Sequence, residues 1–218
     1  MIVNNTNYLE QIYDAIKDYE DVGIFNDLIE GDIENLTSSE PVTIRAGGFS
    51  NYNNLIIVNL SNVTSIERAT FECCTRLTTV NLPSVISIRN SAFAFCYSLT
   101  SVNLPNVVSI EGWGFMFCSS LTTIDLPNIT SIGEFAFSDC EALTSVIIRT
   151  NTLCILDYDD AFSYTPIALG TGHIYVPKAL IEDYKVASNW SKYTSQFRAL
   201  EDYTVDGTTT GELDPNKI

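Results

Sequence analysis

The sequence predicts an α/β solenoid in which short parallel strands stack turn upon turn, preceded by a helical segment and closed by a strand-helix cap. The main observation is a 22-residue period shared by three apolar columns that stay in phase. The columns are Leu55, Leu77, Leu99, Leu121 and Leu143; Ile44, Ile66, Ile88, Ile110 and Ile132; and Phe49, Phe71, Phe93, Phe115 and Phe137. Fixed-period self-similarity of this kind is the signature of stacked repeats, in which each unit buries its apolar side only against its neighbours.

The alternation inside one unit predicts where its strand lies. In LTSVNLP (99–105), Val102 and Leu104 fall on one side and Ser101 and Asn103 on the other, as in a half-buried strand. Pro105 ends the strand because proline has no N–H for the ladder. The rest of the unit, NVVSIEGWGFMFCSS, is expected to turn its apolar residues inward along irregular or short helical backbone; these are Val107, Ile110, Phe115 and Cys118.

A cysteine column at Cys74, Cys96, Cys118 and Cys140 follows the same period and has to be assigned to metal binding, disulfides, catalysis or packing. Thiols carried one per rung are ~4.8 Å apart, so four of them cannot converge on one zinc ion. Disulfides between neighbouring rungs are disfavoured, since the side chains all point the same way into the core. Buried free cysteine packs as a small hydrophobe, and packing is the favoured interpretation.

These columns carry a family resemblance. The pattern L-x-x-V-x-L-P-x-V-x-S-I-x-x-x-A-F-x-x-C is similar to the BspA-like leucine-rich repeat of bacterial surface and secreted proteins. One repeat matches it at Leu77, Val80, Leu82, Pro83, Val85, Ile88, Ala92, Phe93 and Cys96. The first partial turn departs from it, with Tyr52 in the cysteine column. The resemblance implies a parallel-strand solenoid used for adhesion or recognition, and it implies no catalytic residues.

The period and its loss at both ends predict four segments. They are an acidic helical cap or attachment segment at 1–42, the leucine-rich repeat solenoid at 43–165, a C-terminal cap at 166–203 and a polar tail at 204–218. Helical spacing predicts one helix over 7–20 and a second over 24–36. In the cap, Pro177 suits a helix start, and Trp190, Tyr193, Phe197 and Leu200 share a helical spacing. The tail is turn-rich, as in a short strand pair or a linker.

Charge and hydropathy limit the classes of partner that the chain is expected to bind. The chain has 27 acidic against 11 basic residues, a formal net charge of −16, which disfavours nucleic acids and anionic membranes. No segment has the ~20 apolar residues of a membrane span, so no membrane insertion is expected. The N-terminus does not have the form of a signal peptide. Family resemblance predicts a cell-surface or extracellular location, with a cytoplasmic or phage-associated one left open.

The other candidates for chemistry are weak. A Cys154–His173 pair has no orienting motif around either residue. The GTG at Gly170–Gly172 lacks the context of a dinucleotide site and predicts a tight turn. The acidic DYDD at Asp157–Asp160 lacks the spacing of an EF-hand calcium loop. We therefore expect no catalytic residues, no metal site and no cofactor.

The strand positions that point outward form the predicted binding surface, a field of short hydroxyl and amide groups. They are Thr78, Thr79, Asn81, Thr100, Ser101, Asn103, Thr122, Thr123 and Asp125. Binding hot spots favour Trp, Tyr and Arg, which this surface lacks. Larger anchors are therefore sought elsewhere, each with packing as the alternative role; these are Tyr97, Trp113 and Phe135 opposite the strands, and Ile56, Ile57, Ile147 and Ile148 at the ends of the sheet.

These observations predict a non-catalytic recognition or adhesion module that presents a rigid repeat surface to an unknown protein or glycan. The alternative is a structural attachment component of a phage-like tail or other surface assembly, with the acidic N-terminal helices as the docking part. The oligomeric state is left open by the sequence.

Overall fold

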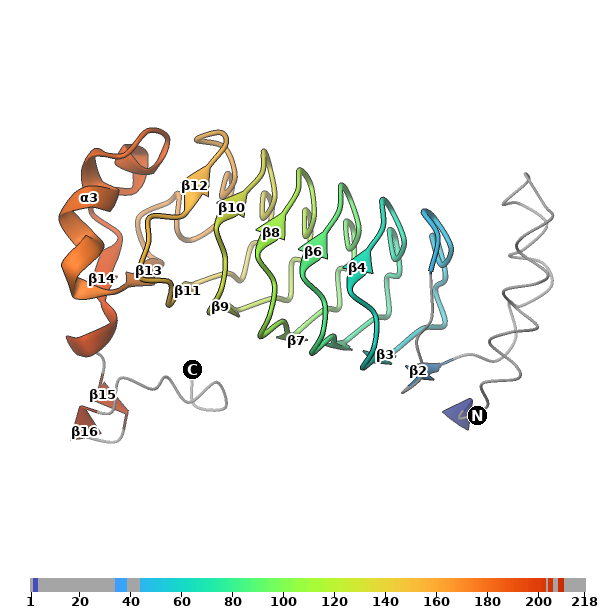
Figure 1. The fold of residues 1–218 in the computed structure, drawn as a ribbon. Coiled ribbons are helices and arrows are strands. Elements are labelled where there is room, and N and C mark those ends of the chain that lie inside the picture. Colours follow the sequence, from blue (N-terminus) through green and yellow to red (C-terminus); the bar gives the residue numbers. More distant parts are fainter. Residues whose placement is uncertain (1, 4–33, 39–43, 203, 206–207, 210–218) are drawn as a thin grey trace.

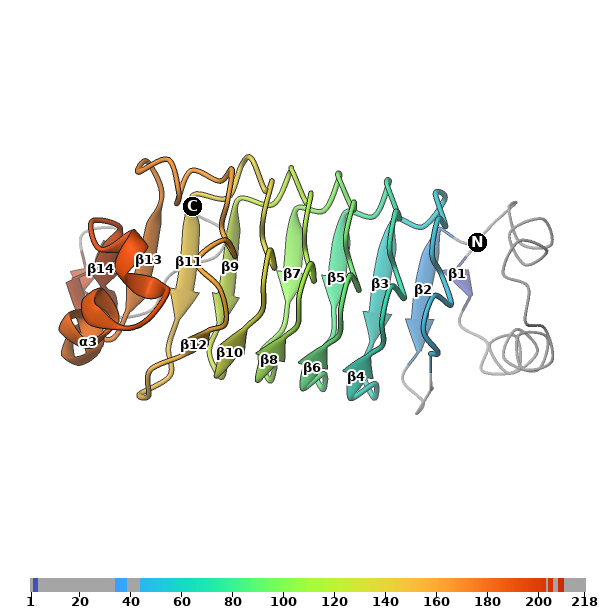
Figure 2. The ribbon, with the colours of Figure 1, turned by 90° about the horizontal axis from the view of Figure 1, so that it is seen from above.

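The computed structural model describes residues 2–3, 34–38, 44–202, 204–205 and 208–209. Figures 1 and 2 show a row of stacked turns that runs from β2 to the helical cap around α3. Each turn places one strand on one side of the stack and a shorter strand on another side, so that equivalent strands form parallel sheets. The predicted parallel-strand solenoid is confirmed.

Three parallel sheets make up the stack. The first contains β1 (Ile2–Val3), β2 (Asn35–Ser38), β3 (Ile57–Leu60), β5 (Thr79–Asn81) and β7 (Ser101–Asn103). The second contains β4 (Ser65–Ile66), β6 (Ser87–Ile88), β8 (Ser109–Ile110), β10 (Ser131–Ile132) and β12 (Ile155–Leu156). The third contains β9 (Thr123–Leu126), β11 (Ser145–Ile148), β13 (His173–Val176) and β14 (Phe197–Ala199).

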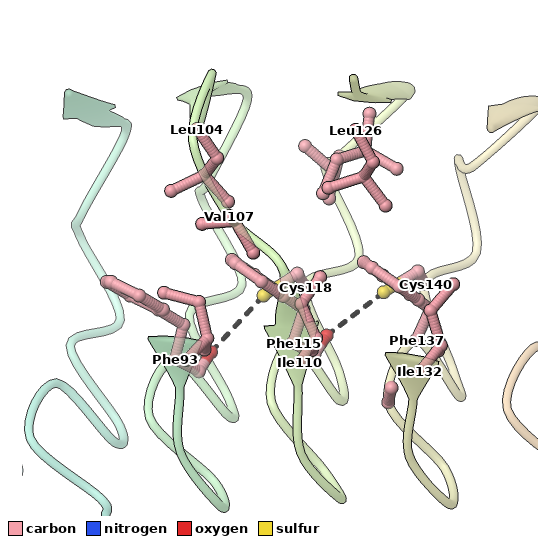
Figure 3. Packing of buried hydrophobic residues seen from close by; sticks show 14 of the residues in the cluster. Phe93, Leu104, Val107, Ile110, Phe115, Cys118, Leu126, Ile132, Phe137 and Cys140 are labelled. Atoms are coloured by element: carbon pink, nitrogen blue, oxygen red, sulfur yellow. Dashed lines mark hydrogen bonds between the residues drawn. The ribbon is translucent and has the colours of Figure 1, made fainter. Parts of the chain in front are cut away.

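The core consists of the apolar columns that the period defines. Val107, Ile110, Phe115 and Cys118 are all buried, as the sequence predicts, and Figure 3 shows them beside their equivalents in the neighbouring turns. The phenylalanine rings stack from Phe49 to Phe162 with centroids 5.2–5.5 Å apart. Tyr52 packs edge-on against Phe49 in the first turn.

The backbone between the strands differs from the short helix that the sequence allowed. It is a chain of tight turns with a left-handed residue at two positions per repeat. One series is Gly47, Ala69, Ser91, Trp113 and Phe135; the other is Asn51, Cys73, Phe95, Phe117, Asp139 and Tyr164. A left-handed residue interrupts helical backbone, so the described repeats contain turns and the short second strand where helix was considered.

At the N-terminal end, the described chain departs from the helix that the sequence predicts. The helix expected over 24–36 is wrong at its last residues, since Asn35 and Leu36 lie in β2 and pair with Ile57 and Val58 of β3. The rest of that helix, and the one expected over 7–20, lie outside the described residues. The residue types explain the difference, because Leu36 (1% exposed) occupies the inward strand column of the solenoid.

The C-terminal cap combines strands and short helices, as expected. After β13 come η1 (Lys178–Leu180), α3 (Ile181–Val186), η2 (Trp190–Tyr193), β14 and η3 (Leu200–Asp202). The helical spacing of Trp190, Tyr193, Phe197 and Leu200 does not reflect one helix, since the chain passes from η2 into a strand, although all four are buried. The tail contains the antiparallel pair β15 (Thr204–Val205) and β16 (Thr208–Thr209).

Candidate functional site: the strand face

The candidate site is the outward side of β3, β5, β7, β9, β11 and β13, called the strand face below. All nine sequence-predicted positions lie on these strands or directly before them, and none of the nine is buried. Four are exposed and five partly exposed; the exposed ones are Thr100, Ser101, Asn103 and Thr122. Strand register brings Thr79 opposite Ser101 and Asn81 opposite Asn103.

An amide ladder fixes the central row of the strand face. The side-chain N–H of Asn103 donates to Oδ1 of Asn81 at 2.7 Å, and that of Asn81 donates to Oδ1 of Asn59 at 2.8 Å. Each amide carries two N–H groups and an oxygen with two lone pairs, so the ladder leaves donors and acceptors free for a ligand. The sequence-based prediction did not include Asn59, although its spacing of 22 from Asn81 was the available signal.

Asp125 ends this ladder, because a carboxylate accepts hydrogen bonds and cannot donate the next one to Asn103. It is instead held by Arg149, whose Nε lies 3.0 Å from both carboxylate oxygens and whose Nη2 lies 2.8 Å from Oδ2. This two-pronged geometry is the strong form of the Arg–carboxylate pair. Arg149 lies 24 residues from Asp125, off the 22-residue period, and so no sequence pattern indicated the pair.

The hydrogen-bonded sheet is interrupted at the same place. The first sheet ends at β7 and the third begins at β9, although the two strands lie in successive turns (Figure 2). The N–H of Thr100 bonds the carbonyl of Thr78, and Thr144 bonds Thr122. Within the described residues no matching bond links Thr122 to Thr100. The second sheet continues without a break, since β8 pairs with β10.

Burial marks the same interruption. Val80 and Ile124 are each 1% exposed, whereas Val102, their equivalent on β7, is partly exposed. The hydroxyl Oγ1 of Thr123 is buried without a hydrogen-bond partner. Six of the nine predicted residues, three from each side, therefore border two unpaired strand edges. Such edges present unpaired backbone N–H and C=O groups.

The strand face changes character toward the cap. Ile147 is buried against Leu200, with Tyr175 packed beside them, and Ile148 points into the core. The suggested role of Ile147 and Ile148 as exposed anchors is therefore wrong, because the cap covers one and the core encloses the other. At the opposite end, Ile57 is exposed and Ile56 partly exposed.

The cysteine column packs in the core as expected, and all six cysteines are free. Each column thiol also donates to a phenylalanine carbonyl oxygen in the preceding turn, at 3.1–3.2 Å. Burial raises the pKa of Cys74 to about 12 and raises the pKa values of Cys96 and Cys118 well above the ordinary range of a thiol. The thiols of Cys74, Cys96 and Cys118 are therefore protonated at neutral pH and poor nucleophiles.

The suggested Cys154–His173 pair is not supported by the surroundings of either residue. Cys154 is buried in the core, and burial, with Asp157 nearby, raises its pKa to about 12. His173 lies on the outward side of β13, edge-on to the ring of Tyr175. Burial and the nearby Arg198 lower the pKa of His173. A protonated buried thiol does not act as a nucleophile at neutral pH.

The acidic DYDD loop holds the cap. The carbonyl oxygen of Asp159 accepts hydrogen bonds from Lys192 and from the hydroxyl of Tyr193, and the carboxylate of Asp160 accepts the N–H of Phe135. No group of three or more metal-ligating side chains occurs in the part of the chain that is described. Among the same residues, no helix has the length and apolar character to cross a membrane.

The Gly170–Gly172 segment is the predicted tight turn. Thr171 and Gly172 both donate their N–H groups to the carbonyl of Pro166, at 2.9 and 2.8 Å. A side chain on Gly172 would lie 2.9 Å from the backbone nitrogen of Ile167. The glycines therefore serve the turn itself.

Comparisons with known proteins agree with this architecture. The family model for the BspA-type leucine-rich repeat region matches residues 42–168 in six copies. A leucine-rich cell surface protein from Faecalibacterium prausnitzii shares the fold with a TM-score of 0.51 and 24% identity, over 78% of this chain and 48% of that one. A leucine-rich repeat protein from Bacteroides ovatus has a TM-score of 0.50 and 21% identity, over 77% and 42%.

The chain spans about half the length of these two solved structures. Comparison with functionally characterised proteins gave no match.

Proposed function

Because this chain belongs to the BspA-type leucine-rich repeat family, we propose that it is a non-catalytic recognition module that binds a protein or glycan through its strand face, at the surface of a bacterial cell. The family suggests a protein-binding or adhesion scaffold. The two solved structures above include a protein described as a cell surface protein, which supports the same location for this chain.

One observation carries the proposal: the polar side chains of the strand face are held in place while part of their hydrogen-bonding capacity stays open. The amide ladder orders Asn81 and Asn103 in the free protein. Pre-ordered groups lose less conformational entropy on binding, which favours affinity. The unpaired edges of β7 and β9 add backbone donors and acceptors at the centre of this surface.

The surface suits a polar ligand. Its short hydroxyl and amide groups offer many hydrogen bonds and little apolar area, and so the affinity of one site is expected to be modest. A protein segment in extended conformation or a chain of sugar hydroxyls would match this chemistry. The proposal covers both of these ligand classes, and the experiment below distinguishes a protein ligand from a glycan.

The test uses arrays of defined glycans and of displayed peptides, probed with the full chain and with Ser101→Arg, which places a long charged side chain on the exposed strand face. Thr64→Arg is the matched control, because Thr64 is exposed and precedes β4 in the second sheet. We expect Ser101→Arg to weaken binding at least tenfold and Thr64→Arg to leave it unchanged. Binding that survives Ser101→Arg would overturn the proposal.

A further inference from the structure

The two left-handed positions of each repeat hold unexpected residues in the middle of the solenoid. In the first series, Gly47, Ala69 and Ser91 are followed by Trp113 and Phe135. In the second, Asn51 and Cys73 are followed by Phe95 and Phe117, and then by Asp139 and Tyr164. Phe95, Phe117, Trp113 and Phe135 thus occupy backbone positions that the preceding turns fill with small or polar residues.

The fold does not require aromatic rings at these positions. Left-handed backbone is easiest for glycine and asparagine, and bulky side chains are strained there. Gly47 and Asn51 show that the same turns form with the favoured residues. All four aromatic side chains remain partly exposed, unlike the fully buried phenylalanine column beside them. A strained and exposed ring points to a role outside folding.

The rings are arranged in two rows, called the aromatic rows below. Phe95 stacks on Phe117 with centroids 5.0 Å apart and planes 14° from parallel, and Tyr97, 44% exposed, contacts Phe95 edge-on. Trp113 and Phe135 lie 6.5 Å apart and 10° from parallel. Because stacking directs the ring faces at each other, the ring edges are left for a partner. Apolar protein side chains suit such edges better than sugars, which pack on open ring faces.

The charges near the aromatic rows indicate which side chains a partner segment would carry. The sequence has no lysine or arginine between Arg89 and Arg149. The same turns carry Glu134, Asp139 and Glu141, and within the described residues none of these three forms an ion pair. The rows are thus apolar groups among uncompensated carboxylates. Such a surface complements a partner with basic side chains.

We propose that the aromatic rows are a docking surface for a partner protein segment that combines apolar side chains with lysine or arginine. Aromatic residues are the commonest binding hot spots. The surface lies on the turns that follow β6, β8 and β10, which are separate from the strand face. It therefore goes beyond the proposed function and can fail independently of it.

The test selects a phage-displayed random-peptide library on the full chain, and then measures the affinity of one synthesised consensus peptide. Phe117→Asn and Trp113→Asn each replace a ring with a residue that favours the left-handed backbone. Ser91→Asn is the matched control, because it introduces the same residue, without removing a ring, at the equivalent position one turn before Trp113. Thermal unfolding checks each variant, and a Tm within about 3 °C of the parent is expected because relief of backbone strain offsets lost packing.

We expect a consensus rich in Lys or Arg beside an aliphatic or aromatic residue. Its Kd should rise tenfold or more in Phe117→Asn and Trp113→Asn, and stay unchanged in Ser91→Asn and in Ser101→Arg. Raising the salt from 50 to 300 mM should weaken binding as well. No consensus, an acidic consensus, or a Kd unchanged by both ring variants would overturn the proposal. If sedimentation shows a dimer that Phe117→Asn dissociates, a second copy of this chain occupies the surface. That result would overturn the proposal of a partner with basic side chains.

Discussion

The thiol of Cys118 lies 3.2 Å from the main-chain carbonyl oxygen of Phe93 in the preceding turn and donates a hydrogen bond to it (Figure 3). Cys140 makes the same bond to Phe115 at 3.1 Å. The column of cysteines therefore links successive turns, in addition to filling space between them. A methyl group in place of the thiol would lack the donor.

Replacing Cys118 with alanine should lower the free energy of unfolding by about 1–2 kcal/mol, from lost burial and a lost hydrogen bond. Urea unfolding of the full chain measures the change. Cys73→Ala is the control, with an expected effect within about 0.5 kcal/mol, because Cys73 is only partly buried. Equal losses in the two variants would show that the column thiols contribute nothing specific.

Thiol alkylation should separate Cys73 from the other cysteines. All six are free, and Cys73 is the one that is not buried. In the native protein at pH 8, iodoacetamide should modify Cys73 first, although burial and the neighbouring Glu72 raise the pKa of its thiol. Mass spectrometry should find six modified cysteines once the protein is unfolded without reductant. A count below six would contradict the packed, unpaired column.

Gly133→Ala should destabilise the solenoid by about 1–3 kcal/mol, as overpacking does in other cores. A Cβ at Gly133 would lie 2.6 Å from the backbone nitrogen of Gly112 in the preceding turn, and backbone cannot move aside without spreading the stack. Gly112→Ala is the comparison, since its nearest atom is the side-chain Cγ of Glu134 at 3.1 Å. Chemical denaturation should show the larger loss for Gly133→Ala; the reverse order would contradict the packing described.

His173 should make stability depend on pH. Burial first, and then Arg198, lower its pKa in the folded chain, so that the unfolded chain binds the proton more readily. The contribution of His173 to the free energy of unfolding is therefore fully present above the ordinary histidine pKa of about 6.5. It is lost as the pH falls through that value toward the lower pKa of the folded chain. Urea midpoints at pH 7.5 and 5.5 should therefore differ more for the parent than for His173→Gln. An equal difference in both would show that His173 is not responsible.

The predictability of the strand face differs from residue to residue. Alternation alone placed Thr100, Ser101 and Asn103 on the outside, because strand side chains alternate and the inward ones are apolar. Asn59 follows from the period. The pairing of Asp125 with Arg149 does not, because it joins residues 24 apart in two different turns.

The sequence by itself determined the period, the core columns and the outward polar rows, since each depends on which side of one turn a residue lies. Only the tertiary structure decided the rest: the left-handed positions under Trp113 and Phe117, the thiol bonds across turns, and the interruption between β7 and β9. These features depend on how one turn is set against the next. That relation follows from the packing and hydrogen bonding of whole turns, which no single repeat of 22 residues contains.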